Sequence, residues 1–218
     1  MLPGSKSSDL ERPAKEYGFF VSFGTEMDES ILIKQHLARH QQVVELVAQQ
    51  LTPAIAGAAR MMTDSLAKGG KLLVMGNGGS AADAQHFAAE LVGRFLRERR
   101  ALPAIALTTD TSILTAVGND YGFKQVFSRQ VEALAKSEDV VIGISTSGNS
   151  SNVLEALTVA RDVGCRTVGL LGCDGGRIAK QVDLALVVPV QETPYIQETH
   201  VAIIHVLCDL VERTFFAD

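Results

Sequence analysis

Five short runs of apolar residues between positions 71 and 188 stand out in the pattern of hydrophobic and polar positions. Each run is apolar at consecutive positions, which is typical of strands buried on both faces of a parallel sheet. The runs are KLLVM at 71–75, PAIAL at 103–107, VVIGI at 140–144, TVGLL at 167–171 and LALVV at 184–188. We therefore predict five strands.

Segments with a helical spacing of apolar residues separate and flank these strands. Between the strands we expect helices at about 79–92, 111–135, 150–163 and 176–181, and after them a last helix at about 194–216. Before them we expect two helices, at 28–51 and 53–68, because proline is favoured in the first turn of a helix. This order predicts an α/β fold: a three-layer α-β-α sandwich with a mostly parallel five-stranded sheet and added N-terminal helices.

The first 27 residues follow neither the strand period nor the helix period. Glycine and proline are scattered through them, at Pro3, Gly4, Pro13, Gly18 and Gly24. We expect residues 1–27 to form a flexible arm. We expect 28–218 to form a single domain, because 218 residues fit one α/β domain better than two.

Charge and composition exclude several classes of protein. Lys and Arg number 20 against 25 Asp and Glu, which argues against a protein that binds nucleic acid by neutralising phosphates. No run approaches the roughly 20 apolar residues of a membrane span, and the N-terminus is charged where a signal peptide would be apolar. Cys165, Cys173 and Cys208 lack metal-binding spacing, so we expect free, buried thiols and a cytoplasmic protein.

Two loops at predicted strand ends have the composition of phosphate-binding loops. Gly76-Asn77-Gly78-Gly79-Ser80 follows the first strand, and Ser145-Thr146-Ser147-Gly148-Asn149-Ser150 follows the third, each directly before a helix. Glycines allow close approach of a ligand, and a helix start offers free N–H groups. A tight turn is the alternative for each loop. The first loop also fits a loose dinucleotide fingerprint, but the acidic residue expected about 20 positions later is missing.

A cluster of possible acid–base or metal-binding residues lies in two predicted helices. His86 and Glu90 are four residues apart, so they share one helix face just after the glycine loop. The last helix contributes Gln197 and His205. Pairs at this spacing are common on exposed helix faces, so a solvated surface pair is the alternative.

Four segments together resemble a known family. They are GNGGSAADAQHFAAELVGR, TAVGNDYGF, ISTSGNSSNV and YIQETHVAIIH, and the resemblance covers about 28–216. The chain resembles proteins of the SIS (sugar isomerase) fold, which is flavodoxin-like, and within it the phosphoheptose isomerases. This resemblance implies a cytoplasmic homotetramer with active sites at subunit interfaces. It also implies isomerisation of sedoheptulose 7-phosphate to D-glycero-D-manno-heptose 7-phosphate.

The resemblance also implies roles for individual residues. It assigns the sugar phosphate to Ser145, Thr146, Ser147 and Ser150. It assigns the rest of the substrate to Asn77, Gly78, Gly79, Ser80, Glu90, Asn119, Asp120 and Gln197. It implies a zinc ion held by His86, Glu90, Gln197 and His205, with Glu90 and His205 as the proton-transferring pair. A zinc-bound carboxylate is a weaker base, so the pattern leaves open whether Glu90 leaves the metal during turnover.

The spacing of two of these ligands conflicts with a site built from one chain. On a continuous helix Gln197 and His205 would lie about 12 Å apart, whereas zinc ligands lie about 2 Å from the metal. Either the last helix begins after Gln197, or one ligand comes from a neighbouring subunit.

Two other functions compete with the isomerase. Some close relatives are adaptors that dock on the bacterial replication initiator, but these lack the glutamate and the second histidine of the enzymes, whereas Glu90, His205 and Gly79 are present here. A sugar-phosphate-sensing regulator would need a DNA-binding module, for which residues 1–27 are too short.

For four further residues the sequence gives less support for a functional role. His36 and His40 are also four apart, but valines continue their face, so we expect packing or an interface. We expect His200 to be structural. Arg94 could bind phosphate or stabilise local structure.

Overall fold

The structure, a computed structural model, describes residues 28–216 and contains one five-stranded sheet. The strands are β1 (Leu72–Gly76), β2 (Ala104–Ala106), β3 (Val140–Ser145), β4 (Arg166–Gly172) and β5 (Leu184–Val188). They lie in the order β2-β1-β3-β4-β5, and every neighbouring pair is parallel. All five predicted strands are therefore present, and the predicted α/β sandwich is confirmed. The arm predicted for 1–27 lies outside the described residues.

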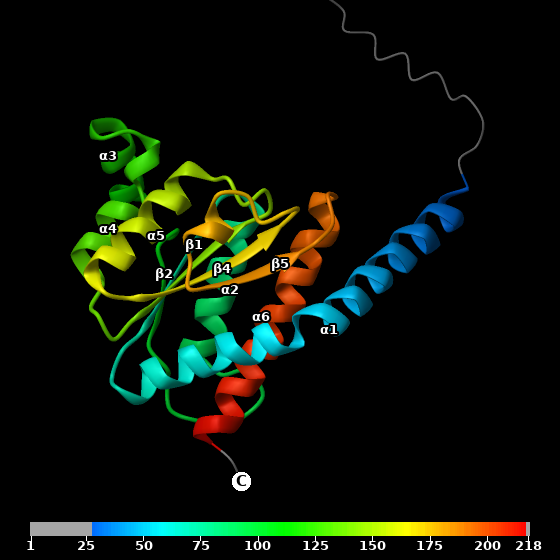
Figure 1. The fold of residues 1–218 in the computed structure, drawn as a ribbon, viewed down its shortest axis with the longest axis horizontal. Helices are drawn as coiled ribbons and strands as arrows, with labels where there is room; N and C mark the ends of the chain where they lie inside the picture. The colour runs from blue at the N-terminus through cyan, green and yellow to red at the C-terminus, as the bar shows by residue number, and fades with distance from the viewer. Residues whose placement is uncertain (1–27, 217–218) are drawn as a thin grey trace, which may run out of the picture.

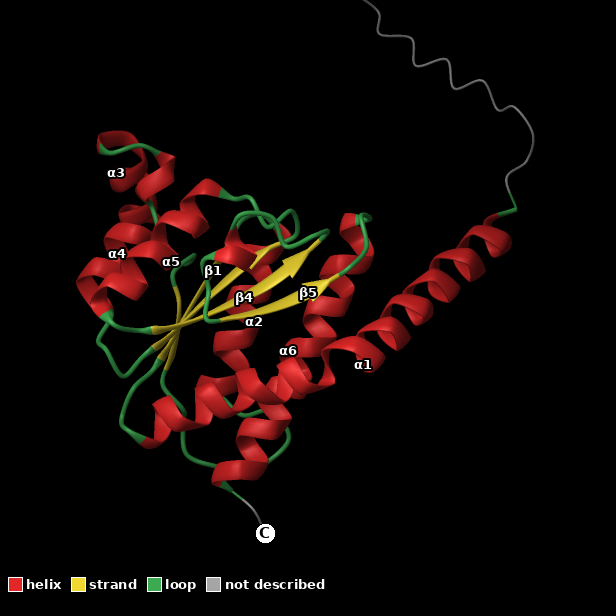
Figure 2. Cartoon of the chain, in the orientation of Figure 1, coloured by secondary structure: helices red, strands yellow, loops and turns green. Residues whose placement is uncertain are grey.

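Helices cover both faces of this sheet (Figures 1 and 2). They are α1 (Glu29–Ala67), α2 (Gly79–Val92), α3 (Thr111–Asp120), α4 (Ser128–Leu134), α5 (Ser151–Val163) and α6 (Thr193–Phe215). Helices α1, α2 and α6 pack on one face, and α4 and α5 pack on the other. Among residues 28–216, no helix combines the length and the apolar character that crossing a membrane requires.

The prediction of two N-terminal helices was wrong, because α1 runs through Pro53 as one helix of 39 residues. Proline removes one backbone hydrogen bond, here the bond to the carbonyl of Gln49, which lies on an exposed stretch that water can reach. Val47 before the proline and Ile55 after it are both buried in the same core, so packing holds the helix on both sides. Figure 1 shows that α1 bends along its course, as expected for a helix that contains proline.

Two of the other predicted helices were also wrong in extent. The segment 111–135 is not one helix but α3, a short 3₁₀ turn at Phe123–Gln125, and α4, because Gly122 adopts a φ of 86° that a helix does not allow. Only a 3₁₀ turn at Ile178–Lys180 forms within 176–181.

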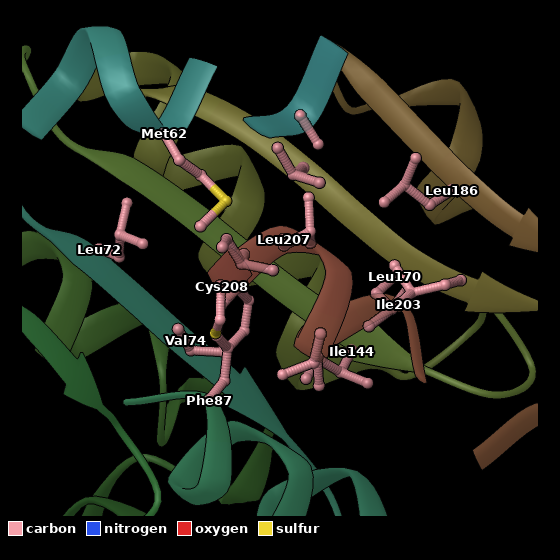
Figure 3. Close-up of a cluster of buried hydrophobic side chains, with 14 of the residues drawn as sticks. Met62, Leu72, Val74, Phe87, Ile144, Leu170, Leu186, Ile203, Leu207 and Cys208 are labelled. Carbon is pink, nitrogen blue, oxygen red and sulfur yellow. The ribbon is translucent and has the colours of Figure 1, made fainter. Parts of the chain in front are cut away.

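The core consists of two apolar clusters, one on each face of the sheet. Alternate residues of β1 supply them: Leu72 and Val74 face the cluster beneath α1, α2 and α6, whereas Leu73 and Met75 face the cluster beneath α4 and α5. Figure 3 shows the cluster on the first of these faces, where side chains from α1, α2 and α6 meet those of the strands. This alternation explains why the strand sequences are apolar at consecutive positions.

The strand order reverses next to β1. The chain passes from β1 to β2 on one side and then returns to β3 on the other side of β1. In sheets of this kind, ligands bind at such a reversal, beyond the carboxyl ends of the strands. The glycine loop (Gly76–Ser80) and the serine loop (Ser145–Ser150) follow β1 and β3 respectively, so both lie at this position.

Candidate active site

The glycine loop is tied to the first turn of α5, directly after the serine loop, by a pair of amides, of which Asn152 is buried and Asn77 is half-buried. Strands β1 and β3 are neighbours, and their register pairs Gly76 with Ile144. Asn77 donates to the side-chain oxygen of Asn152 at 2.9 Å, and Asn152 donates back to Asn77 at 2.8 Å. This reciprocal pair fixes the two loops relative to each other.

Glycine is required in the loop after β1. Gly78 has a φ of 56°, and a Cβ at Gly76 would lie 2.5 Å from the carbonyl oxygen of Ser80. A Cβ at Gly79 would lie 2.4 Å from the side-chain nitrogen of Gln197, so the start of α2 and the start of α6 approach each other closely. The backbone of this loop is therefore shaped by its glycines into a tight strand-to-helix turn.

The serine loop places hydroxyl groups at the start of α5. Ser145 is buried, and its Oγ lies 2.9 Å from Oγ of Ser150, the residue before the first turn of the helix. The hydroxyl of Ser147 accepts from the backbone of Asn149 at 3.2 Å, and Gly148 has a φ of 64°. Thr146 is half-buried in the same loop. Hydroxyl groups beside a helix start can bind a phosphate without any net positive charge.

His86, Glu90 and His205 meet between α2 and α6, and we call them the triad. His86 Nε2 lies 2.9 Å from Glu90 Oε1 and 3.3 Å from His205 Nε2. One ligand atom from each of the three residues lies within 4.8 Å of the others, and all three side chains are half-buried. The i,i+4 pair predicted from the sequence is therefore joined by a histidine that is more than 100 positions away in the chain.

Gln197 lies apart from the triad in the same chain. Helix α6 is continuous from Thr193 to Phe215, so the possibility that the helix begins after Gln197 was wrong. Gln197 lies against Gly79 at the start of α2, whereas His205 lies against His86 further along α2. The two helices thus run side by side in the same direction, with the glutamine and the histidine at different levels.

Asn119 and Asp120 are exposed at the end of α3. The side chain of Asn119 donates to Asp120 at 2.8 Å. Helix α3 stands out from the body of the molecule, on the side away from α6 (Figure 1). Within this chain, the fold does not bring these two residues to the triad.

Asp83 is a buried acid that our sequence reasoning did not single out. It is 8% exposed, its Oδ2 has no hydrogen-bond partner, and burial raises its pKa to about 6 despite the opposing effect of His86. Its position three residues before His86 on α2 is a signal that could have identified it, because residues at that spacing share a helix face.

The other histidines and the arginine singled out in the sequence make packing or ion-pair contacts away from the triad. His200 is fully buried with Nε2 3.0 Å from the carbonyl oxygen of Leu171, and burial lowers its pKa to about 4. His36 and His40 each lie 2.9 Å from Glu198 of α6. Arg94 is exposed and lies 3.6 Å from Glu98.

The three cysteines are free, as expected. Cys165 and Cys208 are buried, and burial raises their pKa values to about 11 and about 12. Cys173 is only half-buried, because it lies in the loop after β4. The prediction that all three would be buried was therefore wrong for this one.

Comparisons with known proteins agree with this arrangement. Residues 35–172 match the family model described as "SIS domain". A phosphoheptose isomerase from Geotalea daltonii is 62% identical over 186 residues, which is 85% of this chain and 97% of that protein. The chain therefore belongs to the SIS domain family, the class that its fold and its loops define. Within that family it belongs to the phosphoheptose isomerases.

Two solved structures extend the similarity to three dimensions. A phosphoheptose isomerase from Neisseria gonorrhoeae is 46% identical with a TM-score of 0.81, covering 84% of this chain and 98% of that one. A phosphoheptose isomerase from Francisella tularensis is 42% identical with a TM-score of 0.83, covering 86% of this chain and all of that one.

Proposed function

We propose that the protein is an aldose–ketose isomerase that converts sedoheptulose 7-phosphate to D-glycero-D-manno-heptose 7-phosphate. This reaction would be the first step toward activated heptose for lipopolysaccharide or other surface glycans. The observation that carries the proposal is the triad, a half-buried group of His86 and Glu90 from α2, the helix that follows the glycine loop, and His205 from α6. The similarity to phosphoheptose isomerases supports the choice of substrate.

The two loops bind the substrate in this proposal. The hydroxyls of Ser145, Thr146, Ser147 and Ser150 hold the phosphate at the start of α5. Asn77, Gly78, Gly79 and Ser80 contact the sugar, and so do Asn119 and Asp120. Phosphate binding far from the reacting carbons supplies binding energy that aligns the sugar for chemistry.

The triad fits a zinc ion. Two imidazole nitrogens and one carboxylate oxygen are zinc ligands, and ligands of a tetrahedral zinc lie about 3.3 Å apart, close to the separations within the triad. The triad would supply three ligands and Gln197 of a neighbouring chain the fourth, and zinc sites can expand to five ligands during a reaction. When bound, zinc would act as a Lewis acid toward the C1 and C2 oxygens of the sugar.

Glu90 and His205 carry out the proton transfer. Glu90 accepts a proton from C1, and the C1–H bonding electrons form the C1–C2 double bond of an enediol as the C2 oxygen takes up a proton. The enediol then loses its O1 proton to solvent, which also supplies the proton on O2; the carbonyl forms at C1, and His205 acts as the acid that returns a proton at C2. Asp120 orders a substrate hydroxyl, and in the proposed shared site it comes from a neighbouring subunit, because the fold of one chain does not bring it to the triad. Positioned acids and bases typically accelerate such steps by 10²–10⁴-fold.

We propose that the working unit is a homotetramer with active sites at subunit interfaces. An apolar groove of about 390 Å³ runs between α1 and α6, lined by residues such as Val44, Val47 and Leu210. The first part of α1 projects from the body (Figure 1) and exposes Ile31, Ile33 and Leu37. Subunit contacts on these surfaces would bring Gln197 of a neighbouring chain toward the triad as a further ligand.

The cellular location in this proposal is the cytoplasm. Three free cysteines among the described residues suit a reducing compartment. The adaptor function is not favoured, because Gly79, Glu90 and His205 are all present and the last two lie together in the triad.

The proposal is tested by incubating zinc-loaded protein with sedoheptulose 7-phosphate and following the aldoheptose phosphate by NMR. We expect conversion by the wild type, and a decrease in kcat of about 10²–10⁴-fold in Glu90→Gln, because the amide cannot accept the proton. His205→Ala should show a comparable loss. No conversion by the zinc-loaded wild type would refute the isomerase function.

A further inference from the structure

Glu212 is a fully buried carboxylate with four hydrogen-bond donors around it. Oε1 accepts from the backbone of Phe95 at 2.8 Å and from Nε of Arg99 at 2.8 Å. Oε2 accepts from the backbones of Leu96 at 2.9 Å and Arg97 at 3.0 Å. Burial alone would raise the pKa of Glu212, but these donors lower it overall. The carboxylate therefore fixes the turn that follows α2 onto α6.

Arg99 joins the same carboxylate to the end of α2. Its side chain is fully buried, and it donates to the carbonyl oxygens of Glu90 at 2.8 Å and Leu91 at 2.8 Å. The last carbonyls of a helix lack partners within the helix, and an arginine there also complements the helix dipole. Because Glu90 itself belongs to the triad, Arg99 holds the backbone of a triad residue.

The Glu212 carboxylate also fixes the position of Phe95, whose ring packs against His205. His205 and Glu212 are two turns apart on one face of α6, both directed toward α2 and the turn after it. The ring of Phe95, whose backbone Glu212 binds, lies 5.3 Å from the His205 ring, centroid to centroid, at 33°. The ring of His86 also lies near His205, 5.0 Å away between centroids in an edge-on arrangement. His205 is thus held between a triad partner and Phe95.

We propose that Glu212 is a positioning residue for the triad, acting through Arg99 on α2 and through Phe95 on the His205 ring. This inference rests on the proposed isomerase function and names how the same site is held in place. A buried ion pair contributes little net stability compared with apolar packing. The four hydrogen bonds of Glu212 join α6 to the turn after α2. We therefore assign them the role of fixing the separation between α2 and α6.

The chain offers a matched control for loss of a buried carboxylate. Asp139 is 1% exposed and accepts from the backbones of Lys71 and Lys136, both at 2.8 Å. It lies at the start of β3, at the opposite end of the sheet from the two loops. Asp139→Asn should therefore lower stability as Glu212→Gln does, without affecting the triad.

The first experiment measures zinc affinity by competition with a chromophoric chelator, together with kcat, KM and Tm, for the wild type, Glu212→Gln and Asp139→Asn. All assays are run well below the lowest Tm. We expect both variants to lower Tm, but only Glu212→Gln to weaken zinc binding and lower kcat, each by 10–100-fold, the range seen when residues that orient metal ligands are changed. KM should change less than threefold.

The second experiment tests Phe95 with variants that keep its backbone N–H. Phe95→Leu should weaken zinc binding by about 10-fold, whereas Phe95→Tyr, which keeps an aromatic ring beside His205, should bind zinc as the wild type does. Phe127 is 3% exposed in the cluster on the other face of the sheet, so Phe127→Leu is the matched control and should leave zinc affinity unchanged.

The outcomes separate this inference from the proposed function. If the wild type neither binds zinc nor isomerises the sugar phosphate, both are wrong. If the wild type does both, and folded Glu212→Gln and Phe95→Leu keep zinc affinity and kcat within twofold of the wild type, the positioning role is wrong while the isomerase function stands. Equal losses of zinc affinity in Glu212→Gln and Asp139→Asn would also overturn it, because the effect would then be one of general stability.

Discussion

His200 and His205 are close in sequence but have different surroundings in the structure. His200 and His205 lie five residues apart on α6, which places them on different faces of the helix. His200 points into the core, where it is fully buried, whereas His205 is half-buried beside His86. Helical geometry alone predicts that the two differ, but only the packing of α6 on the sheet decides which one reaches α2.

The buried His200 makes stability depend on pH. Burial lowers its pKa from the usual 6.5 to about 4, so between these values the unfolded chain binds a proton that the folded chain does not. Stability therefore falls as pH drops through this window, by about 1.4 kcal/mol per unit for this group. We expect the free energy of unfolding of His200→Leu, measured in urea, to lack this contribution.

Asp83 changes the stability in the opposite direction over the same pH range. Its pKa is raised to about 6, so its protonation stabilises the folded chain as pH falls. The wild-type curve alone would mix the two groups, so the result is taken as the difference between wild type and His200→Leu. A difference that stays constant between pH 6.5 and pH 4 would contradict a neutral, buried His200.

At the scale of elements, the strands were predictable and the helix boundaries were less so. A parallel strand buried on both faces leaves a local signature, and all five appeared within two residues of their predicted ends. Whether Pro53 ends a helix depends on the packing of Val47 and Ile55 on the sheet, which no local pattern reports. Phe95, Arg99 and Glu212 escaped prediction for the same reason, since their contacts span more than 100 residues of sequence.

The contact between the two loops can be tested through Asn152. Asn152→Leu would leave the half-buried amide of Asn77 without this partner, so we expect a loss of about 0.5–1.5 kcal/mol in the free energy of unfolding, the net worth of a typical hydrogen bond. The glycine loop would also lose its anchor, and KM for sedoheptulose 7-phosphate should rise. Urea denaturation and initial rates measure the two effects.

A double variant provides the control for this prediction. Replacing both partners of a buried hydrogen bond by apolar groups can be nearly neutral. Asn77→Leu with Asn152→Leu should therefore recover part of the lost stability. If Asn152→Leu matches the wild type in both stability and KM, the reciprocal amide pair does not join the loops.

The whole molecule has an apolar surface that one chain does not cover. The groove between α1 and α6 and the exposed apolar residues of the projecting part of α1 are on the same side of the sheet. Large apolar patches of this kind mark protein–protein interfaces. In the proposed tetramer, this surface would also have a role in catalysis, because Gln197 lies apart from the triad of its own chain.

Val44 tests whether that surface joins subunits. It lines the groove and is 36% exposed, so Val44→Glu would place a charge in the proposed interface. We expect light scattering to show four chains for the wild type and fewer for Val44→Glu, with a large loss of isomerase activity. Leu134 is 39% exposed on α4, on the other face, and Leu134→Glu should change neither. A fully active Val44→Glu monomer would contradict a shared site.

The central claim, proton transfer by Glu90 and His205 through an enediol, is tested most directly by running the reaction in D₂O. Glu90 removes the proton from C1 and His205 delivers a different one to C2. Because the His205 imidazole exchanges its proton with solvent, C2 receives deuterium. We expect NMR to show aldoheptose 7-phosphate carrying deuterium at C2, formed by the wild type and not by Glu90→Gln. Product that forms at the wild-type rate without deuterium at C2, or in equal amounts with Glu90→Gln, would contradict the account.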